Sequence, residues 1–499
     1  MENNNNFYER IGTNLLLAII ILAAALMRFY NLGGESYWYD EIMTLNATAG
    51  EIKQILTGPR PQFFLIIAYG WIKIFGVSET ATRSLSCVFG TFSILLIYLV
   101  ARELYNKKVG IIASLIMAFS QFQIYYSQEF RYYSLFVLTT LLSFYCLIKY
   151  LKNPEGYRLI LYVISNMLMY YSHYFGLFSI AAQGVFCLFL MNQKKRADYR
   201  LLSGFFLILL PVSLKIFSFM NDALSNEPTG PNWLAQTSIY DPLITLRNYI
   251  GSGLDYPSLT TIMTGLIFFL SGTVIFIKIK GISKWTESLK NTKNNFRFIL
   301  VSNETLLIVL WFTFPIVIPF VISEISAPIY HYRYTMGASP AFYIIIALFL
   351  WHCRQVVPEI VSVGMFLIIL IPGLMQFYNT PVREQWREAA QLVRANFSNN
   401  SDVIIFNNDY NNLNCFRWYF KDKFSTCIVN TDRGYKSFLK SMYRCSRAHD
   451  RIWFVVREAP DKLPEAVRSG LLNGENKSLS VSSVYKLTKI TVYLINRKE

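Results

Sequence analysis

Charged and aromatic side chains that could carry out chemistry stand in four short stretches, each at the end of an apolar run. They lie at residues 37–41 with Arg60, at residues 125–131, at His173, and at Glu324 with residues 331–334. A charge inside a membrane-spanning helix costs about 3 kcal/mol, so charged residues at the ends of such helices are candidates for a functional site. Together they would supply a base, an anion-binding group and surfaces for a sugar ring.

This combination suits the transfer of a sugar from a polyprenyl phosphate. The leaving group is then a phosphate, which is stable as an anion, so no general acid is needed and one carboxylate can act as base on the acceptor hydroxyl. Glycoside hydrolysis, in contrast, uses two carboxylates because an alkoxide must leave. Arginines would stabilise the charge that develops on the departing phosphate.

The composition requires that these residues be positioned by membrane helices. The chain has 499 residues, of which 53% are hydrophobic and only 16% are charged, and its mean hydropathy is +0.33. Soluble domains contain about 25% charged residues. Apolar runs recur from residue 13 to residue 378 and lack the alternation of a β-barrel. We therefore expect a polytopic protein of transmembrane helices.

We expect eleven spans, at residues 11–30, 84–101, 109–125, 133–149, 158–172, 175–192, 201–220, 258–278, 299–322, 336–352 and 356–377. The first apolar run, Leu15 to Met27, lacks a small-residue cleavage site before Arg28 and is expected to remain as an uncleaved signal anchor. The N-terminus is then inside and the C-terminus outside the plasma membrane.

Basic residues support this orientation, because cytoplasmic loops are rich in Lys and Arg. The loops expected inside contain Arg102, Lys107, Lys108, Lys149, Lys152, Arg158, Lys194, Lys195, Arg196, Arg200, Lys278, Lys280, Lys284, Lys290, Lys293 and Arg297. The formal net charge of +16 follows this distribution. We therefore expect a lipid bilayer and no nucleic acid as a partner.

The stretch from Pro61 to Gly76 decides the number of spans. It is apolar, but as a helix between its Pro and its Gly it is about 21 Å long, which is short of the roughly 30 Å hydrocarbon core. Counting it as a span would also place Arg102, Lys107 and Lys108 outside. We expect a helix that lies in the outer interface.

The chain changes character after residue 378. Amphipathic helical patterns at REQWREAAQLVRANF and YKSFLKSMYR alternate with strand patterns at DVIIFNN, IWFVVRE and ITVYLIN. We expect a transmembrane domain at residues 1–378 and a small extracytoplasmic α/β domain at residues 379–499. Cys415, Cys427 and Cys445 allow one disulfide in an exported domain, although their number is odd.

Several motifs occur in order along the chain. They are RFYNLGGESYWYDEIMTLNA, RPQFFLIIAYGWIKIFGVSETATRSLSCVFG, FQIYYSQEFRYYSL, YSHYFG, HYRYTMGASPAFYIIIAL and QWREAAQLV. Together they resemble the C-type (GT-C) glycosyltransferases related to protein O-mannosyltransferases and to lipid A aminoarabinose transferases. The resemblance covers most of residues 25–180 and returns near residues 330–350 and 383–393. It implies an all-α GT-C membrane fold of about 11 transmembrane helices with outer-face juxtamembrane helices.

The resemblance also implies roles for individual residues. Asp40 corresponds to the catalytic base, supported by Glu41, and Arg60 to the basic residue that contacts the lipid phosphate. Tyr334 corresponds to a tyrosine that binds that phosphate, with Arg333 adjacent. The pair of prolines common before the interfacial helix appears here as Pro59-Arg60-Pro61. Residues 180–320 match nothing in the family, and Arg247 within them is a further candidate phosphate ligand.

The complete predicted site combines these residues with their neighbours on the expected outer face. We expect Asp40, Glu41 and Glu129 to be catalytic; Arg60, Arg131, Arg333 and Tyr334 to bind the donor phosphate; and Trp38, Tyr39, Tyr126, Gln128, His173 and His331 to bind substrate. Neither a metal nor another cofactor is expected. The expected partners are a polyprenyl-phosphate-linked sugar and an acceptor glycan, lipid or protein.

Each of these residues also has an ordinary structural interpretation. Asp40 and Glu41 would be solvated loop charges, and Arg60 an anchor to lipid headgroups. Glu129, Arg131 and the pair at residues 333–334 would be interface residues, and Arg83 would flank a span. His173 would be a structural hydrogen-bonding residue.

The leading hypothesis is an inverting glycosyltransferase, and it has competitors. An oligosaccharyltransferase would carry a WWDYG-like motif, and no WWD occurs. A transporter would place its charges near the bilayer midplane in repeated halves. A structural membrane protein with a binding module is the third alternative. The leading hypothesis requires residues 38–41 and residues 333–334 to meet beside a lipid headgroup on the non-cytoplasmic side; the sugar and the acceptor stay open.

Overall fold

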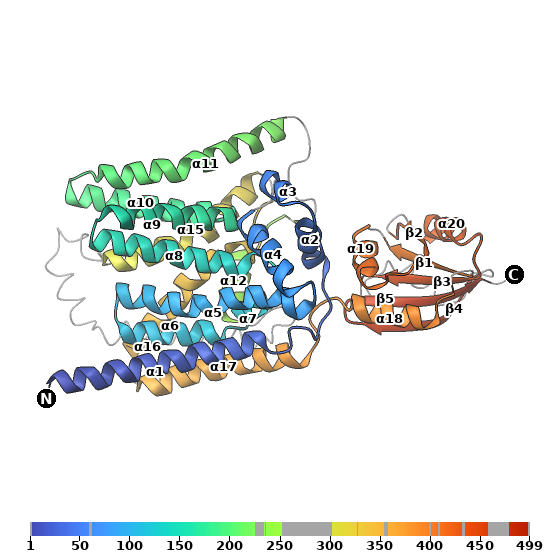
Figure 1. Cartoon of the computed structure of the whole chain (residues 1–499), viewed down its shortest axis with the longest axis horizontal. Coiled ribbons are helices and arrows are strands. Elements are labelled where there is room, and N and C mark those ends of the chain that lie inside the picture. The colour runs from blue at the N-terminus through green and yellow to red at the C-terminus, as the bar shows by residue number, and fades with distance from the viewer. Residues whose placement is uncertain are drawn as a thin grey trace. The chain divides into compact units, whose positions relative to one another are not determined.

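The computed structural model of the chain describes residues 2–58, 62–224, 234, 236–251, 302–326, 328–353, 358–398, 401–407, 410–431, 435–457 and 479–497. The chain divides into two compact units (Figure 1). The first consists of Met1–Tyr30, Ile52–Trp71 and Arg83–Phe377, and the second of Asn31–Glu51, Ile72–Thr82 and Tyr378–Glu499.

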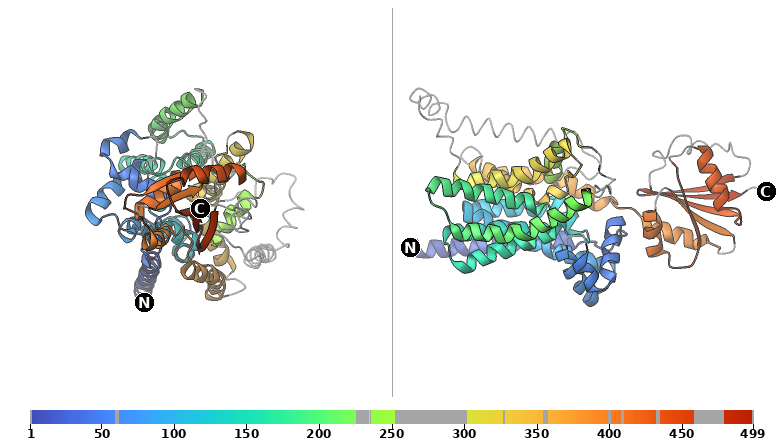
Figure 2. Two further views of the ribbon diagram at one scale, coloured as in Figure 1. Left: turned by 90° about the vertical axis from the view of Figure 1, so that its right-hand side faces the viewer. Right: turned by 90° about the horizontal axis from the view of Figure 1, so that it is seen from above.

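The first unit is built from helices that run side by side (Figures 1 and 2). The long or apolar ones are α1 (Glu2–Phe29), α5 (Glu79–Leu104), α6 (Lys107–Phe119), α7 (Gln121–Ser127), α8 (Tyr133–Lys152), α9 (Gly156–Ser172), α10 (Gly176–Lys194), α11 (Tyr199–Leu224), α15 (Asn303–Ile325), α16 (Ser339–Cys353) and α17 (Glu359–Asn379). The shorter ones are α3 (Ile52–Thr57), α4 (Gln62–Phe75), α12 (Asp241–Ile250) and the 3-10 helix η1 (Tyr334–Ala338). Helix α8 packs on α9, α10 on α15, and α6 on α16.

The expected spans can be compared with these helices. Seven of them correspond to described helices that are long and apolar enough to cross a membrane, at Ile11–Phe29, Glu79–Leu104, Tyr133–Lys152, Gly176–Lys194, Asn303–Ile325, Tyr334–His352 and Glu359–Asn379. The spans expected at 158–172 and 201–220 coincide with α9, which has 17 residues, and with α11. The span expected at 258–278 lies outside the described residues. The helix expected between Pro61 and Gly76 is α4, of 14 residues, and its place in the interface stays a prediction.

The segment expected as one span at 109–125 is two helices, α6 and α7, with a bend of 61° between them. Ser120 ends α6 in an extended conformation and caps α7 by accepting the N–H of Gln123. A break of this kind leaves helix C-terminal carbonyls without intrahelical partners. The buried guanidinium of Arg28 donates to two of them, those of Met117 and Ala118, each at 3.1 Å.

Aromatic side chains form the part of the core that packs against η1, the short helix before α16. Trp311 of α15 stacks on Phe144 of α8 with ring centroids 3.8 Å apart. Its indole N–H donates to the carbonyl of Gly337 in η1 at 2.7 Å. A Cβ at Gly337 would lie 2.9 Å from the ring of Phe136, so η1 approaches α8 this closely because residue 337 is a glycine.

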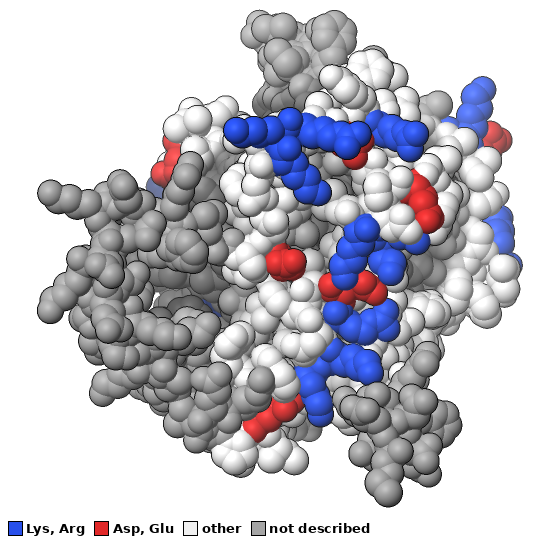
Figure 3. Space-filling view, turned by 90° about the vertical axis from the view of Figure 1, so that its left-hand side faces the viewer, with Lys and Arg blue, Asp and Glu red and all other residues white. Residues whose placement is uncertain are grey.

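One end of the first unit is rich in Lys and Arg, as Figure 3 shows. Helices α5, α8 and α10 end there, and α6 and α11 begin there, with basic residues that include Lys107, Lys194 and Arg200. Glu103 lies among these cations, with Arg102 at 3.1 Å, Lys152 at 3.0 Å and Lys149 at 3.5 Å. Cations at span ends are typical of the cytoplasmic side.

The second unit contains a five-stranded sheet in the order β2-β1-β3-β5-β4. The strands are β1 (Asp402–Asn407), β2 (Ser425–Val429), β3 (Arg451–Val456), β4 (Leu479–Leu487) and β5 (Ile490–Arg497), and the helices are α2 (Tyr39–Ala49), α18 (Trp386–Asn396), α19 (Tyr410–Tyr419) and α20 (Tyr435–Cys445). Strands β1, β2 and β3 are parallel, whereas β5 pairs antiparallel with β3 and β4. The expected small α/β domain is confirmed.

Helices cover both faces of this sheet. Successive side chains of a strand point to opposite faces, so neighbouring residues of β1 contact different helices. Val403 and Ile405 of β1 belong to a core with Phe438 and Met442 of α20. On the other face, Phe406 packs against Phe416 of α19 with ring centroids 5.3 Å apart. Helix α18 packs against α19.

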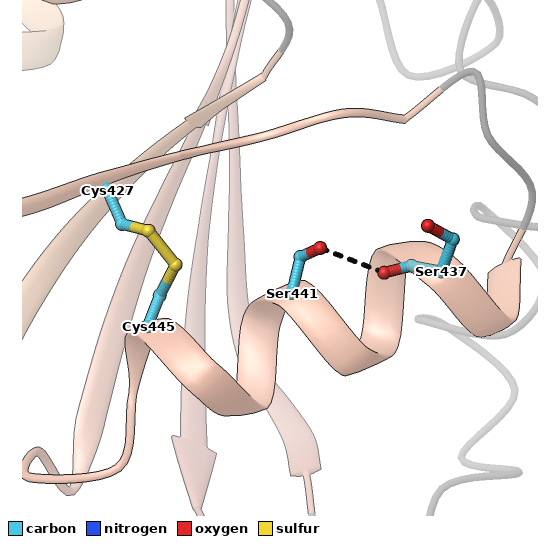
Figure 4. The surroundings of a disulfide bond; sticks show 4 residues. All are labelled: Cys427, Ser437, Ser441 and Cys445. Atoms are coloured by element: carbon cyan, nitrogen blue, oxygen red, sulfur yellow. Dashed lines mark hydrogen bonds between the residues drawn. A yellow bond between two sulfur atoms is a disulfide. The ribbon is translucent and has the colours of Figure 1, made fainter.

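A disulfide joins Cys427 of β2 to Cys445 at the end of α20, with the Cα atoms 5.9 Å apart (Figure 4). Cys415 is buried and is not part of this disulfide. Disulfides persist in oxidising compartments. The pairing therefore resolves which two of the three cysteines in this domain form the bridge that the sequence allows.

Candidate functional site

The first unit brings three loops together at the end opposite its basic face. These loops are residues 128–132 between α7 and α8, residues 173–175 between α9 and α10, and the described residues of 326–333 before η1. Helix α8 runs from Tyr133 at the first loop to Lys152 at the basic face, which is about 30 Å for its 20 residues. The N-termini of α8 and α10 lie at this end, and helix N-termini favour negative charge.

His173 lies at the centre of the cluster. It is 6% exposed and stacks on Phe136 with ring centroids 4.9 Å apart. Its ring lies 5.1 Å from that of Tyr132, 5.4 Å from that of Phe175 and 5.3 Å from that of Tyr334. His331 is 5.6 Å from Tyr334 on the same measure. The three loops are thus joined by aromatic contacts.

Two arginines border this aromatic cluster. Arg131 lies over the ring of Tyr132, with its guanidinium carbon 4.6 Å from the ring centroid, and donates to the tyrosine hydroxyl at 3.2 Å. Arg333 lies over the ring of Tyr334 at 5.5 Å. Both guanidinium groups are close enough to His173 to act on its charge. Two half-buried cations around one histidine form a positive environment that suits an anion.

Both histidines are neutral. Burial first, and then the charges of Arg131 and Arg333, lower the pKa of His173 to about 3. Burial and then Arg333 lower the pKa of His331 to about 3. In each ring, Nδ1 accepts a backbone N–H two residues later, from Phe175 at 3.1 Å and from Arg333 at 3.3 Å. The remaining proton of each neutral ring is therefore on Nε2, which is a donor.

Glu129 and Tyr126 lie in the same part of the first unit. The carboxylate of Glu129 is fully buried in the loop between α7 and α8. The side chain of Tyr126 is close enough to Glu129 and Arg333 to interact with both charges. Tyr126 also contacts Tyr133, with ring centroids 5.0 Å apart. A buried carboxyl group therefore lies close to Tyr126 in this part of the first unit.

Gln128 has a structural contact that the sequence did not indicate. Its amide nitrogen donates to three carbonyls at the end of α1, those of Met27 at 3.2 Å, Arg28 at 3.1 Å and Tyr30 at 3.0 Å. These carbonyls lack intrahelical partners. The side chain fixes the end of α1, and its expected part in substrate binding stays a prediction.

Asp40 and Glu41 belong to the second unit, in the first turn of α2. The buried Glu41 carboxylate accepts the N–H of Trp38 at 3.4 Å, and the Glu41 N–H donates to the Trp38 carbonyl at 3.1 Å. This reciprocal pair of bonds fixes the start of the helix. Asp40, the next residue back, is half-buried. Tyr39 is the first residue of α2, and a helix N-terminus stabilises carboxylates of this kind.

The remaining predicted residues are placed as follows. Arg60 lies outside the described residues. Arg83 is fully buried in α5. Arg247 is in α12, which is fixed to the third loop by a bond of 2.7 Å between the hydroxyls of Thr245 and Tyr330. Tyr132 and Phe175 were not predicted, although they stand in the RYYSL and YSHYFG motifs and both contact His173.

The family model described as dolichyl-phosphate-mannose-protein mannosyltransferase matches residues 59–218. A search by sequence found no match among curated proteins. ArnT from Cupriavidus metallidurans bound to undecaprenyl phosphate superposes with a TM-score of 0.55 at 10% identity, covering 96% of this chain and 97% of that one.

The chain has the GT-C glycosyltransferase fold. The Archaeoglobus fulgidus oligosaccharyltransferase in the apo form is also similar, with a TM-score of 0.50 at 11% identity, covering 90% of this chain and 70% of that one. At 10% and 11% identity, these superpositions establish a shared fold and leave the activity of this chain open. The fold and the matched family model together support a glycosyltransferase.

Proposed function

We propose that this protein is an inverting glycosyltransferase that moves a sugar from a polyprenyl phosphate to an acceptor on the outer face of the membrane. The cluster of Arg131, Arg333 and Tyr334 around two neutral histidines carries the proposal. Guanidinium groups bind phosphate through paired hydrogen bonds, and aromatic rings pack on sugar faces. The structure of ArnT bound to undecaprenyl phosphate, which shares this fold, supports the choice of donor.

In the proposed reaction the acceptor oxygen attacks the anomeric carbon from the face opposite the phosphate. The bond from that carbon to the phosphate oxygen breaks, and its electron pair leaves with the polyprenyl phosphate. The acceptor proton passes to Asp40, which acts as the base. Arg131, Arg333, Tyr334 and the predicted Arg60 stabilise the charge that develops on the departing phosphate. Glu41 supports the base by fixing the start of α2.

The outer location has two supports. A face rich in Lys and Arg is typical of the cytoplasmic side. The cluster lies at the opposite end of the first unit from that face. The Cys427–Cys445 disulfide in the second unit is typical of an oxidising compartment.

The test uses purified protein in lipid vesicles with a panel of undecaprenyl-phosphate sugars, and membranes from a strain lacking the protein as the source of acceptor. The readout is release of undecaprenyl phosphate. Asp40→Asn is expected to lower the rate about a hundredfold or more, the range of a general base. Transfer by Asp40→Asn at the wild-type rate, with normal protein levels, would exclude Asp40 as the base.

The phosphate-binding role is tested in the same vesicles by the affinity for undecaprenyl phosphate. Arg333→Ala is expected to weaken binding about tenfold or more, since a hydrogen bond to a charged group is worth about 1.5–3 kcal/mol. Arg200→Ala, on the exposed basic face, is the matched control and should bind normally. Equal affinity in the two variants would remove Arg333 from the site.

The alternative is an oligosaccharyltransferase, which has a neighbour of the same fold. The two activities differ in the donor, a single sugar on a phosphate against an oligosaccharide on a lipid diphosphate. Including both donors in the panel decides between them. Turnover of the diphosphate-linked oligosaccharide alone would favour the alternative.

A further inference from the structure

Residues 31–38, which precede α2 and are here called the strap, hold a conformation fixed by close packing within the second unit. Asn31 has a positive φ of 54°. A Cβ at Gly33 would lie 2.7 Å from the hydroxyl oxygen of Thr80, and a Cβ at Gly34 would overlap the side chain of Asn31. A side chain at either glycine would displace a neighbouring side chain, so the strap is closely packed where it passes the start of α5.

Helix α18 and the residues before it hold the first half of the strap. The guanidinium of Arg387 donates to the carbonyl of Gly33 at 3.0 Å and to that of Gly34 at 2.7 Å. Arg383 forms an ion pair with Glu35 at 2.8 Å, and its side chain is only 4% exposed. A buried, charge-assisted bond of this geometry is stronger than a surface ion pair.

The second half of the strap is held through the next residues. The hydroxyl of Ser36, which is 1% exposed, donates to the carbonyl of Glu384 at 2.7 Å. Glu384 in turn accepts from Arg457, at 2.7 Å, and from the indole of Trp386, at 2.6 Å. The strap is thus continuous with the hydrogen-bond network of the C-terminal domain.

Helix α19 holds the end of the strap and the start of α5 together. The hydroxyl of Tyr419 accepts the N–H of Tyr37 at 2.6 Å and donates to the carboxylate of Glu79 at 2.7 Å. The hydroxyl of Tyr37 pairs with that of Thr82 at 2.6 Å. Helix α2 packs on α19. The strap ends at Trp38, and Asp40 follows two residues later in the first turn of α2.

We propose that the C-terminal domain positions the base, with Arg387 and Tyr419 as positioning residues. This inference rests on the proposed function of Asp40. A base must be held within a fraction of an ångström of its working position, and a displacement of 1 Å costs about a hundredfold in rate. Contacts along residues 33–37 fix the backbone that carries Asp40. The QWREAAQLV motif contains Arg387 and, in this proposal, contributes to the reaction through these bonds.

The competing interpretation is that the domain only binds the acceptor. The two interpretations differ in the kinetic parameter that they affect. A mispositioned base lowers kcat and leaves the donor and acceptor KM values unchanged, whereas lost acceptor binding raises the acceptor KM. Arg387→Ala removes the bonds to Gly33 and Gly34, and Tyr419→Phe removes one oxygen atom and both of its bonds.

The experiment measures kcat and both KM values in lipid vesicles for Arg387→Ala, Arg387→Lys, Tyr419→Phe and Asp40→Asn. We expect Arg387→Ala to lower kcat about tenfold to a hundredfold with both KM values within about twofold of wild type. Arg387→Lys should recover part of the loss, because an ammonium can still donate to one carbonyl. Tyr419→Phe should lower kcat in the same way, and it decides the question if Arg387→Ala does not fold.

The matched control is Arg444→Ala. Arg444 is exposed on α20, which covers the opposite face of the sheet from α19. The kcat of Arg444→Ala should therefore stay at the wild-type value. If Asp40→Asn is inactive while Arg387→Ala and Tyr419→Phe turn over at the wild-type kcat, or change only the acceptor KM, the positioning role is wrong and the proposed function stands. If Asp40→Asn is fully active, Asp40 is not the base, and the positioning role that rests on it is wrong even though the protein transfers sugar.

Discussion

At the scale of single residues, the cluster around His173 combines two arginines that are always charged with two uncharged histidines. Arg131 and Arg333 are cationic at every physiological pH, whereas burial and these same cations hold the pKa of His173 at about 3. Protonated imidazoles here would add like charge to two arginines. As neutral rings with the proton on Nε2, His173 and His331 would donate hydrogen bonds to a sugar or phosphate oxygen without altering the charge of the site.

The same shift makes the fold sensitive to acid. Because the pKa of His173 falls from 6.5 to about 3 on folding, its contribution to stability is complete above pH 6.5 and is lost as the pH falls toward 3. Between pH 6.5 and pH 5, protonation of the unfolded chain lowers the free energy of unfolding by about 2 kcal/mol. The thermal unfolding midpoint in detergent should therefore fall over this range, and less steeply in His173→Gln. Equal slopes would contradict the assignment.

At the scale of elements, buried side chains near the ends of α1 and α7 cap the ends of other helices. Arg28 near the end of α1 donates to carbonyls at the end of α6, and Gln128 after α7 donates to carbonyls at the end of α1. Both side chains are buried. This exchange fixes the 61° bend between α6 and α7 and with it the loop that carries Glu129 and Arg131.

Removing one cap tests this account. Arg28→Met leaves the carbonyls of Met117 and Ala118 buried with a partner lost, which costs about 1–3 kcal/mol of unfolding free energy. The variant should unfold at a lower temperature, and its sugar transfer should fall because the α7–α8 loop moves. Lys108→Met, exposed on the basic face, is the control and should unfold like the wild type. A normal midpoint for Arg28→Met would show that the bend does not need this cap.

At the scale of the whole molecule, each of the two units has a feature that indicates its side of the membrane. The first unit has a face rich in Lys and Arg, and the second contains a disulfide. Cytoplasmic thiols are kept reduced, so a stable bridge favours an exported second unit.

The bridge provides the test of that orientation. In protein taken from intact cells and alkylated without reduction, peptides containing Cys427 and Cys445 should be recovered as a linked pair. Replacing both with serine should lower the free energy of unfolding by about 3 kcal/mol, since the bridge closes a loop with a sequence separation of 18. Complete alkylation of both cysteines without reduction would place the domain in a reducing compartment.

The sequence by itself determined the class of molecule and indicated several residues of the cluster around His173. Apolar runs near 20 residues long predicted membrane helices, and helix patterns alternating with strand patterns after residue 378 indicated the small sheet. Basic loop residues indicated which ends of the helices share a face. Arg131, His173, Arg333 and Tyr334 were predicted because charged and aromatic residues stood together at span ends in recognisable motifs.

The tertiary structure decided what no local pattern could indicate. Periodicity reports which face of a helix is buried, but not which distant segment covers it. The pairing of Arg28 with α6, of Gln128 with α1, and of Arg387 with the strap joins residues about 90, 100 and 350 positions apart. These bonds depend on backbone carbonyls, which every residue carries and which leave no trace in the sequence.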